Sequence, residues 1–296
     1  MEASSQAGIA SVQKVLAVIV VYNCHWDAVV AAGYLLRQLE RATPQAPLQL
    51  DRLVIYDNSP LPMAAPAAPH ARIDYRHDPG NGGTRGAYDY ALQQAGAGGQ
   101  AWLLLLDQDT LLPDNYLQKA SEACAAHPGR QVDLLFPRVE DAGRCISPGY
   151  VTRLGSVAPV AKGALPGDTA RRGLTGIASG SMVRAAAWRK IAPLPPQLWL
   201  DYVDHWIFHQ MNLGGASGAL VDATLQHKLS ILNMAEVSRQ RLDSILDGER
   251  LFMRSLGLPA RLAYPVRLLL RLARLRASCP PAASNMLAWL SLRFAR

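Results

Sequence analysis

Two carboxylates one residue apart, Asp107 and Asp109, directly follow the apolar run WLLLL at 102–106. Such a run predicts a strand buried on both faces inside a parallel sheet, and residues i and i+2 of a strand point to the same side. Two like charges held this close repel each other unless a cation or hydrogen-bond donors lie between them. Because Mg²⁺ is held by one or two carboxylates together with substrate phosphates, the pair favours a metal site for a nucleoside diphosphate over a solvated loop.

Two further segments are candidates for the same site. Asp57 ends the segment LDRLVIYD and could accept a hydrogen bond from a base or ribose, although an Asp-Asn-Ser turn is an equal alternative. The glycine-rich loop GNGGTRG, 80–86, contains Asn81 and Gly82 and precedes a predicted helix, where backbone amides can bind an anion. It matches neither the P-loop nor the dinucleotide fingerprint, so a plain helix entry stays open.

The segment 201–215, DYVDHWIFHQMNLGG, predicts a helix that ends at its two glycines. Asp201 and Asp204 share one face of it, and one of them could be a general base. The alternative is an N-cap at Asp201 and a solvated Asp204. His205 and His209 have the spacing of a metal pair, but no H-E-x-x-H motif is present, and packed or surface histidines are favoured.

The elements that would position these residues alternate between strand and helix, which predicts an α/β fold with a mostly parallel sheet. Strands are expected at 14–22, 50–59, 72–77, 102–106 and 176–184, and helices at 26–40, within 78–96, at 113–127 and at 201–215. The stretch 142–176 shows no clear periodicity and is interpreted as a loop or acceptor-side insertion. From about 236 the chain is expected to be helical, with breaks at Pro259, Pro265 and the pair Pro280–Pro281.

Composition limits the class of protein. With 296 residues, 50% of them hydrophobic, the chain can form one large domain with an appendage, and disorder of the whole chain is excluded. The four cysteines form no CxxC pair, residues 1–13 lack the pattern of a secretory signal, and no apolar run is long enough for a membrane span. We therefore expect a cytoplasmic protein with reduced thiols.

The formal net charge of +7 is concentrated at the C-terminal end. From Pro259 to Arg296 there are seven arginines and no acidic residue, so the 30 basic and 23 acidic residues of the chain leave 23 of each before that segment. The balanced body is not expected to bind nucleic acid or other polyanions. The basic tail is expected to have a partner of its own.

Seven short motifs occur in an order that resembles the family 2 glycosyltransferases of the GT-A fold, and within them the rhamnosyltransferase-like enzymes of surface-polysaccharide assembly. They are VIVVYN, VIYDNS, NGGTRGAYDYAL, WLLLLDQDT, ASGSMVR, WLDYVDHW and LQHKLS, and the resemblance covers about residues 14–230. The resemblance implies a catalytic domain over 14–235, built on a mostly parallel central sheet flanked by helices. A basic helical tail would follow at 236–296.

The resemblance also implies roles on the donor side of the site. Tyr22 would lie against the nucleotide base, Asp57 would bind the base, and Asp107 would bind the ribose or the metal. Asn81 and Gly82 would belong to a donor-side loop, whose role is left open because Arg85 departs from the small or apolar residue more common there.

The same resemblance assigns the reacting groups. Asp109 would coordinate Mg²⁺ or Mn²⁺ on the donor diphosphate, and His227 would close over this metal-diphosphate group. Asp204 would be the base that takes the proton from an acceptor hydroxyl. The next position is often acidic in the family, but His205 occupies it in this chain. The implied reaction is inverting transfer from a nucleoside-diphosphate sugar, with dTDP-L-rhamnose as the candidate, to a lipid-linked glycan.

Two other functions fit the sequence less well. A sugar-nucleotide nucleotidyltransferase should carry a glycine-rich, arginine-containing loop after its first strand, and VVYNCHWD stands there instead. A non-catalytic binding protein on the membrane would be signalled by loss of Asp109 or Asp204, and both are present.

The tail segment 264–276, YPVRLLLRLARLR, predicts an amphipathic helix on an anionic membrane surface at the inner face of the cell membrane. Arg267, Arg271 and Arg274 would form one stripe and approach the headgroups. The leucines of the other faces would enter the acyl chains, namely Leu268, Leu269, Leu272 and Leu275. The alternative is that this helix packs on the catalytic domain or on a second subunit of a homo-oligomer.

Overall fold

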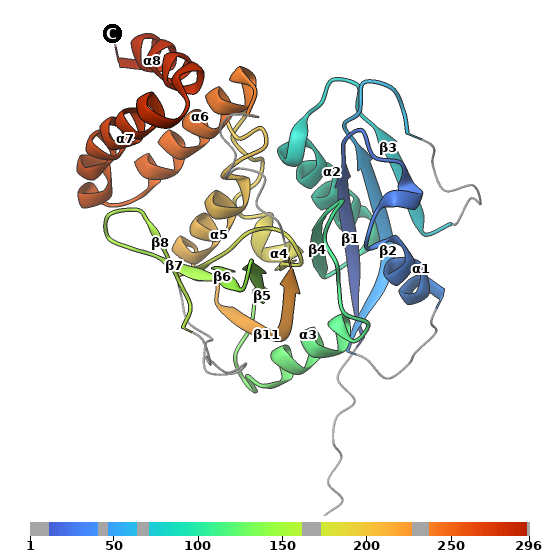
Figure 1. Ribbon diagram of the computed structural model, residues 1–296. Helices are drawn as coiled ribbons and strands as arrows, with labels where there is room; N and C mark the ends of the chain where they lie inside the picture. The colour runs from blue at the N-terminus through green and yellow to red at the C-terminus, as the bar shows by residue number, and fades with distance from the viewer. Residues whose placement is uncertain (1–11, 41–46, 64–70, 162–172, 227–236, 295–296) are drawn as a thin grey trace, which may run out of the picture.

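The computed structural model describes residues 12–40, 47–63, 71–161, 173–226 and 237–294 (Figure 1). Its centre is an eight-stranded sheet with the order β11-β5-β10-β4-β1-β2-β3, in which β6 pairs with β5. The strands are β1 (Gln13–Val21), β2 (Leu48–Asp57), β3 (Ile73–His77), β4 (Trp102–Asp107), β5 (Leu134–Asp141), β6 (Arg144–Ser147), β10 (Met182–Arg184) and β11 (Gly218–Gln226).

The sheet is mostly parallel, because β1 to β4 run in the same direction and β11 runs parallel to β5. Strand β10 is antiparallel to both of its neighbours, β4 and β5. Val20 of β1 lies opposite Asp107, and Val21 lies opposite Asp57. The carboxyl ends of β1, β2 and β4 therefore meet at one edge of the sheet, as predicted, and this edge is where open α/β sheets bind ligands.

Helices cover both faces of the sheet (Figure 1). Helices α1 (Ala32–Glu40) and α3 (Tyr116–Ala125) pack on one face, and α2 (Gly83–Gly98), α4 (Ala185–Trp188) and α5 (Val203–Leu213) pack on the other. The predicted α/β fold is thus confirmed. Two helices begin later than expected, since 26–28 forms only the 3₁₀ turn η1 (Trp26–Ala28) and 113–115 forms a turn before α3.

The stretch 142–176, for which the sequence predicts a loop or an acceptor-side insertion, is not a loop throughout. Besides β6, it contains β7 (Gly149–Val151), β8 (Val157–Pro159) and β9 (Leu174–Thr175), which pair as a second antiparallel sheet in the order β8-β7-β9. Strands of two or three residues are too short to show the period-2 pattern on which the interpretation relied. The strand expected at 176–184 is limited to β10, and its earlier residues form a loop beside β4.

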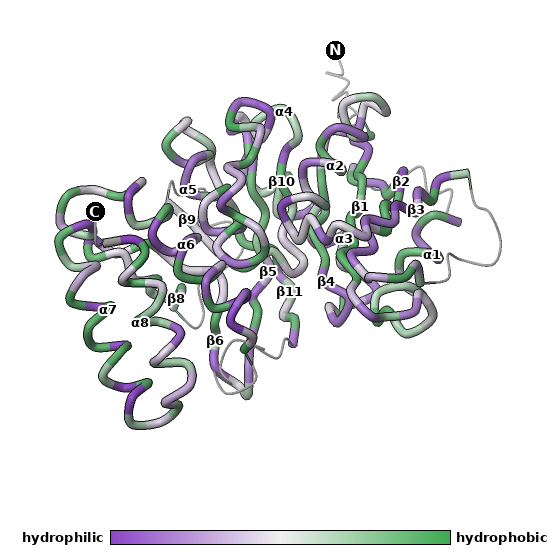
Figure 2. The backbone as a smooth tube through the Cα atoms, turned by 90° about the horizontal axis from the view of Figure 1, so that it is seen from above, coloured by the Kyte–Doolittle hydropathy of each residue, from purple (hydrophilic) through white to green (hydrophobic). Residues whose placement is uncertain are grey.

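The C-terminal unit consists of α6 (Arg239–Ser255), α7 (Leu258–Ser278) and α8 (Pro280–Phe294), which share a hydrophobic core of their own. Figure 2 shows α7 and α8 side by side at the edge of the molecule, with hydrophobic and hydrophilic stretches alternating along both. In the described part of the chain, no helix is long and apolar enough to cross a membrane. The predicted division at 235/236 falls in 227–236, outside the described residues.

Two expectations for the tail are corrected. Pro265 does not break the helix, since α7 runs through it and the proline lies on the exposed side, where water can replace the lost backbone hydrogen bond. The arginine stripe does not face outward as a whole, because Arg267 and Arg271 pair with buried Glu249 of α6. Three of the four leucines of that segment are buried in the core of the C-terminal unit, namely Leu268, Leu272 and Leu275.

Candidate active site

A cavity of about 750 Å³ lies at the carboxyl ends of β1 and β4. One side is formed by residues 20–22, by 107–109 and by the start of α2. The other side is formed by 177–179 and 199–205, and α6 closes the cavity with Ser238, Gln240 and Arg241. The cavity therefore joins the first half of the sheet to the C-terminal helices.

The acidic turn after β4 differs in shape from the prediction. Strand β4 ends at Asp107, and Gln108 and Asp109 form a turn that Thr110 closes by donating its amide to the Asp107 carbonyl over 3.1 Å. The two carboxylates are therefore not successive same-face residues of a strand. Asp107 accepts a 2.5 Å hydrogen bond from Ser179 Oγ, whereas Asp109 is exposed, and both line the cavity.

The donor set at this turn fits a divalent cation. Within the described ranges, no three His, Cys, Asp or Glu side chains come together in a way that could hold a metal by themselves. Mg²⁺ and Mn²⁺ accept one or two carboxylates with phosphate and water oxygens completing the shell, and the carboxylates of Asp109 and Asp107 beside an open cavity meet that need. His227, the other predicted metal ligand, lies outside the described residues.

Tyr22 and Asp57, both predicted to contact the base, have different environments. Tyr22 lines the cavity and is 49% exposed, and its amide donates to Gln108 Oε1 over 2.8 Å. Asp57 is fully buried, and its carboxylate accepts hydrogen bonds from the Ser59 and Met63 amides and the Tyr75 hydroxyl. These bonds hold the chain after β2, so the role of Asp57 toward a base stays a prediction.

The glycine-rich loop enters α2 with its amides already paired. Gly80 and Gly82 donate to the Asp78 carboxylate, and Gly83 donates to Asn58 Oδ1. Gly83 has a φ of +67°, and a Cβ there would lie 2.3 Å from the Trp199 carbonyl oxygen. This arrangement favours the plain helix entry over a backbone phosphate cradle.

Of the two loop residues assigned to the donor side, only Asn81 lines the cavity. Its carbonyl accepts a 2.7 Å hydrogen bond from Trp199 Nε1, which fixes the loop against the opposite wall. Gly82 lies behind it, where a Cβ would come within 2.7 Å of Asp78 Oδ2. The donor-side role of Gly82 therefore stays a prediction, and the structure gives it a role in turn geometry.

Asp204 lies in the first turn of α5 and faces the cavity. Its carboxylate accepts from the amides of Ala178, at 3.1 Å, and His205, at 2.7 Å. The residue before α5 is Tyr202, not Asp201 as the N-cap alternative requires, and its φ of 65° is a left-handed conformation that costs about 1–3 kcal/mol in a non-glycine residue. Such strain is typical of a site whose surroundings determine the backbone.

Asp201 is the second carboxylate of this turn. Its side chain is 11% exposed and lies 3.6 Å from the Arg241 guanidinium, while its Oδ2 is buried with no hydrogen-bond partner. Burial raises the pKa of Asp201 to about 6, although Arg241 opposes the shift. A carboxyl group with this pKa can take or give a proton near neutral pH.

This raised pKa predicts a dependence of stability on pH. Because the folded-state pKa lies above the ordinary value, the native state keeps a proton that the unfolded chain releases, and this stabilisation is lost as the pH rises to about 6 and beyond. Asp201→Asn cannot ionise, so its Tm should rise relative to wild type by about 2 °C or more between pH 4.5 and pH 7.5. Thermal melts at both pH values measure this, and a constant difference would contradict the raised pKa.

His205 and His209 do not form a metal pair. His205 Nδ1 lies 2.9 Å from Thr175 Oγ1, whereas His209 Nε2 lies 3.3 Å from the Ser255 carbonyl and its ring packs on Phe252. The two rings have different hydrogen-bond partners and both pack near Phe252, which supports the interpretation as packed histidines.

Sequence reasoning missed several residues that line the cavity. Gln108 and Ser179 lie inside quoted motifs but were given no role, and Asn58 stands next to Asp57. Arg241 gave no signal, because it lies in α6 and reaches the site only through the packing of the C-terminal unit on α5.

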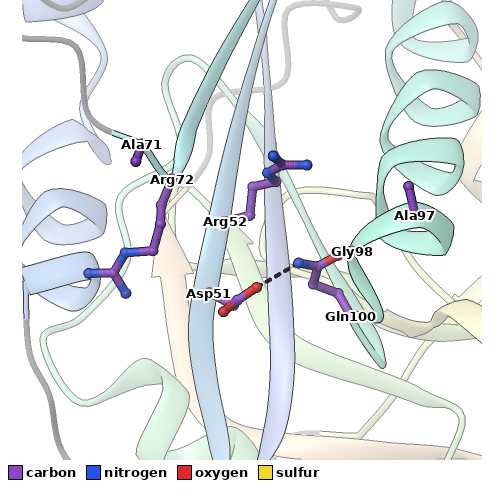
Figure 3. Close-up of a pocket in the computed structure, with 7 residues that line it drawn as sticks. All are labelled: Asp51, Arg52, Ala71, Arg72, Ala97, Gly98 and Gln100. Atoms are coloured by element: carbon purple, nitrogen blue, oxygen red, sulfur yellow. Dashed lines mark hydrogen bonds between the residues drawn. The ribbon is translucent and has the colours of Figure 1, made fainter.

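A second cavity, of about 440 Å³, lies near the start of β2 and the end of α2 (Figure 3). Figure 3 shows that Arg52 and Arg72 point away from each other, and Asp51 is bound to Gln100 Nε2 at 2.6 Å. Its charged groups do not converge on one point, so we do not assign this cavity a ligand.

Comparison with known proteins agrees with this geometry. Residues 16–155 match the family model described as glycosyl transferase family 2. No curated protein matches the chain. The family prediction is thus supported over the matched segment, and the rhamnosyltransferase-like subtype stays a prediction.

Solved structures share the fold at low sequence identity. GalNAc-T7 with UDP, GalNAc and Mn²⁺ has a TM-score of 0.53 and 12% identity over 79% of this chain. The Pyrobaculum calidifontis mannosyltransferase PcManGT with GDP-Man and Mn²⁺ has a TM-score of 0.50 and 13% identity, covering 94% of this chain and 75% of its own. S. aureus TarS has a TM-score of 0.50 and 13% identity, and the match covers 93% of this chain and 55% of the TarS chain. This chain spans 47% of the GalNAc-T7 chain, and the likeness confirms the GT-A type of fold.

Proposed function

We propose that the protein is an inverting, metal-dependent glycosyltransferase that moves a sugar from a nucleoside-diphosphate sugar to a hydroxyl group of a lipid-linked glycan. The observation that carries this proposal is one cavity lined by Asp107 and Asp109 after β4 and by Asp204 at the start of α5. Carboxylates on two walls suit two tasks, namely donor binding and proton removal.

On the donor wall, the half-exposed ring of Tyr22 is available to stack on a base, and Asp109 would hold the cation together with Asp107. His227 is proposed as a further ligand that closes over the diphosphate. A divalent cation bound there supplies positive charge that offsets the charge developing on the leaving diphosphate. UDP and GDP-Man, each with Mn²⁺, are bound in two structures of similar fold and are therefore the first donors to test beside dTDP-rhamnose.

On the opposite wall, Asp204 accepts the proton of the attacking hydroxyl. The Ala178 and His205 amides fix the direction of its carboxylate. The hydroxyl oxygen then forms the new bond at the anomeric carbon while the bond to the diphosphate breaks on the other side, and the configuration inverts in one displacement. No covalent nucleophile is required.

The decisive experiment incubates the purified protein with Mg²⁺ or Mn²⁺, a panel of nucleotide sugars and lipid-linked acceptors. We expect release of a nucleoside diphosphate that depends on acceptor, together with a product of inverted anomeric configuration. Release of pyrophosphate from a sugar phosphate and a nucleoside triphosphate would instead indicate a nucleotidyltransferase. Absence of turnover with every pair would contradict the proposal.

We also propose that α7 holds the enzyme on an anionic membrane surface at the cytoplasmic side, where a lipid-linked acceptor is confined. The outer face of α7 carries five large apolar side chains that are 54–67% exposed, namely Leu258, Leu262, Val266, Leu269 and Leu270. Exposed Arg261, Arg274 and Arg276 lie on the same helix, and no acidic residue follows Pro259. Each such arginine contributes about 1 kcal/mol of binding free energy near an anionic surface. A second copy of the chain would instead bring like charges together at this face.

The double variant Leu262→Gln/Leu269→Gln is expected to weaken vesicle binding about tenfold or more, because burying a leucine side chain is worth about 1.5–3 kcal/mol. Flotation with vesicles that contain phosphatidylglycerol, at low salt, measures the bound fraction. Point substitutions are preferred to removal of α7, whose other side forms part of the core of the C-terminal unit.

The matched control is Leu213→Gln, which changes an equally exposed leucine at the end of α5. It should float like wild type. If wild type fails to float, or if all variants float equally, α7 is not the membrane-binding element.

A further inference from the structure

A buried carboxylate connects the C-terminal helices to the turn that carries Asp204. Glu249 of α6 is 1% exposed, and the Arg271 guanidinium of α7 binds both of its oxygens, with Nη1–Oε2 at 2.6 Å and Nη2–Oε1 at 2.9 Å. Arg267 Nη2 lies 3.7 Å from Oε1. Burial and the charge of Glu249 raise the pKa of Tyr202. Glu249 therefore connects α6 to two arginines of α7, and its charge acts on Tyr202.

Helix α6 also packs directly on this turn. A Cβ at Gly248 would come within 2.8 Å of the Asp201 carbonyl oxygen and 3.2 Å of the Tyr202 Cβ. The Tyr202 ring lies 5.8 Å from that of Phe252 and packs against both the main core and that of the C-terminal unit. Helix α6 thus packs closely on Tyr202, one of the non-glycine residues with a positive φ.

The ion cluster of Glu249, Arg267 and Arg271 is not needed merely to pack α6 on α7. Burying a carboxylate carries a desolvation penalty of several kcal/mol, and well-packed apolar residues of similar volume often stabilise a protein as much or more. What a bidentate pair adds is geometric definition, because it fixes the direction of both partners. On the site side, Glu249 directly follows Gly248, whose backbone packs on Tyr202, two residues before Asp204.

We propose that Glu249, held by Arg271 and Arg267, is a positioning residue that fixes the backbone of Tyr202 and thereby the carboxylate of Asp204. The proposal rests on the proposed glycosyl transfer, in which Asp204 is the base. The C-terminal helices are then part of the catalytic apparatus, and the helix proposed to dock on the membrane also supplies the arginines that fix the site.

The first test compares Glu249→Gln with Asp247→Asn on the same helix. Asp247 pairs with Arg293 of α8, at 2.9 and 3.1 Å, and does not line the cavity. Glu249→Gln should lower kcat about 10- to 100-fold with little change in the KM for the donor, because a small misplacement of a reacting group costs that much. Asp247→Asn should leave kcat within about twofold of wild type, since its loss affects only stability. Equal losses of kcat in both variants would overturn the proposal.

The second test does not require turnover. The Ala178 amide donates to Asp204 Oδ2, so displacement of the turn should expose this amide. Hydrogen exchange of the segment 174–182 should be faster in Glu249→Gln and unchanged in Asp247→Asn. Unchanged exchange in both would overturn the positioning role, whereas inactivity of the wild-type protein would count only against the proposed function.

A third variant, Tyr202→Phe, covers the case in which Glu249→Gln does not fold. It keeps the ring packed and removes only the hydroxyl, whose pKa the Glu249 charge raises. We expect the same faster exchange and a lower kcat. A wild-type kcat together with wild-type exchange would overturn the proposal.

Discussion

Asp204→Asn is expected to lower kcat by about 10²- to 10⁴-fold, the range typical for loss of a general base. The amide is nearly isosteric with the carboxylate, and its one oxygen can still accept from the Ala178 amide, so the turn should keep its shape although the bond from the His205 amide is lost. What the variant loses is the capacity to take the proton of the acceptor hydroxyl. Steady-state kinetics with the active donor and acceptor measure the change in kcat, and calorimetry with the nucleoside diphosphate and Mn²⁺ should show unchanged donor affinity.

Asp201→Asn is the matched control for this prediction. Asp201 belongs to the same turn and lines the same cavity, but its side chain is 11% exposed and is paired with Arg241. We expect a smaller loss of kcat than in Asp204→Asn. If Asp204→Asn keeps the wild-type kcat and Asp201→Asn loses it, the base is Asp201, whose pKa of about 6 would suit that task.

The elements that position the donor wall could be predicted from local patterns. The run at 102–106 and the acids after it are contiguous in sequence, and the parallel pairing of β1 with β2 and β4 places their carboxyl ends at one edge. Burial on both faces makes such strands apolar throughout, which is a strong signal. The turn at Gln108 and Asp109 was missed because a strand pattern does not say at which residue the strand ends.

The opposite wall depends on contacts between segments far apart in sequence. Ser179 reaches Asp107 across 72 positions, and Arg241 reaches the turn at Asp201 only because α6 packs on α5. Neither contact has a local signature. Likewise, the pattern of 264–276 predicted an amphipathic helix but not which side of the helix faces the molecule. That orientation depends on Glu249, which lies in another helix and is buried against Arg271.

Asp109→Ala is expected to lower transfer by about 10²- to 10³-fold or more, because stabilisation of a leaving diphosphate by a bound cation is worth several kcal/mol. The side chain is exposed and lies in a turn at the mouth of the cavity, so its removal should leave the fold intact and change the Tm by only about 1–2 °C. The loss is therefore predicted to fall on donor binding and not on stability.

Calorimetry with UDP, GDP and dTDP, each with and without Mn²⁺, separates these effects. Wild type should bind one of these nucleotides more tightly with Mn²⁺ than without it. Asp109→Ala should lose this gain in affinity and keep the affinity measured without Mn²⁺. Asp114→Ala is the matched control, since this carboxylate is also exposed, lies shortly after the same turn and pairs only with Arg37 on the surface. If Asp109→Ala retains the Mn²⁺-dependent affinity of wild type, the acidic turn does not hold the metal, and the leaving diphosphate must be stabilised by other groups of the cavity.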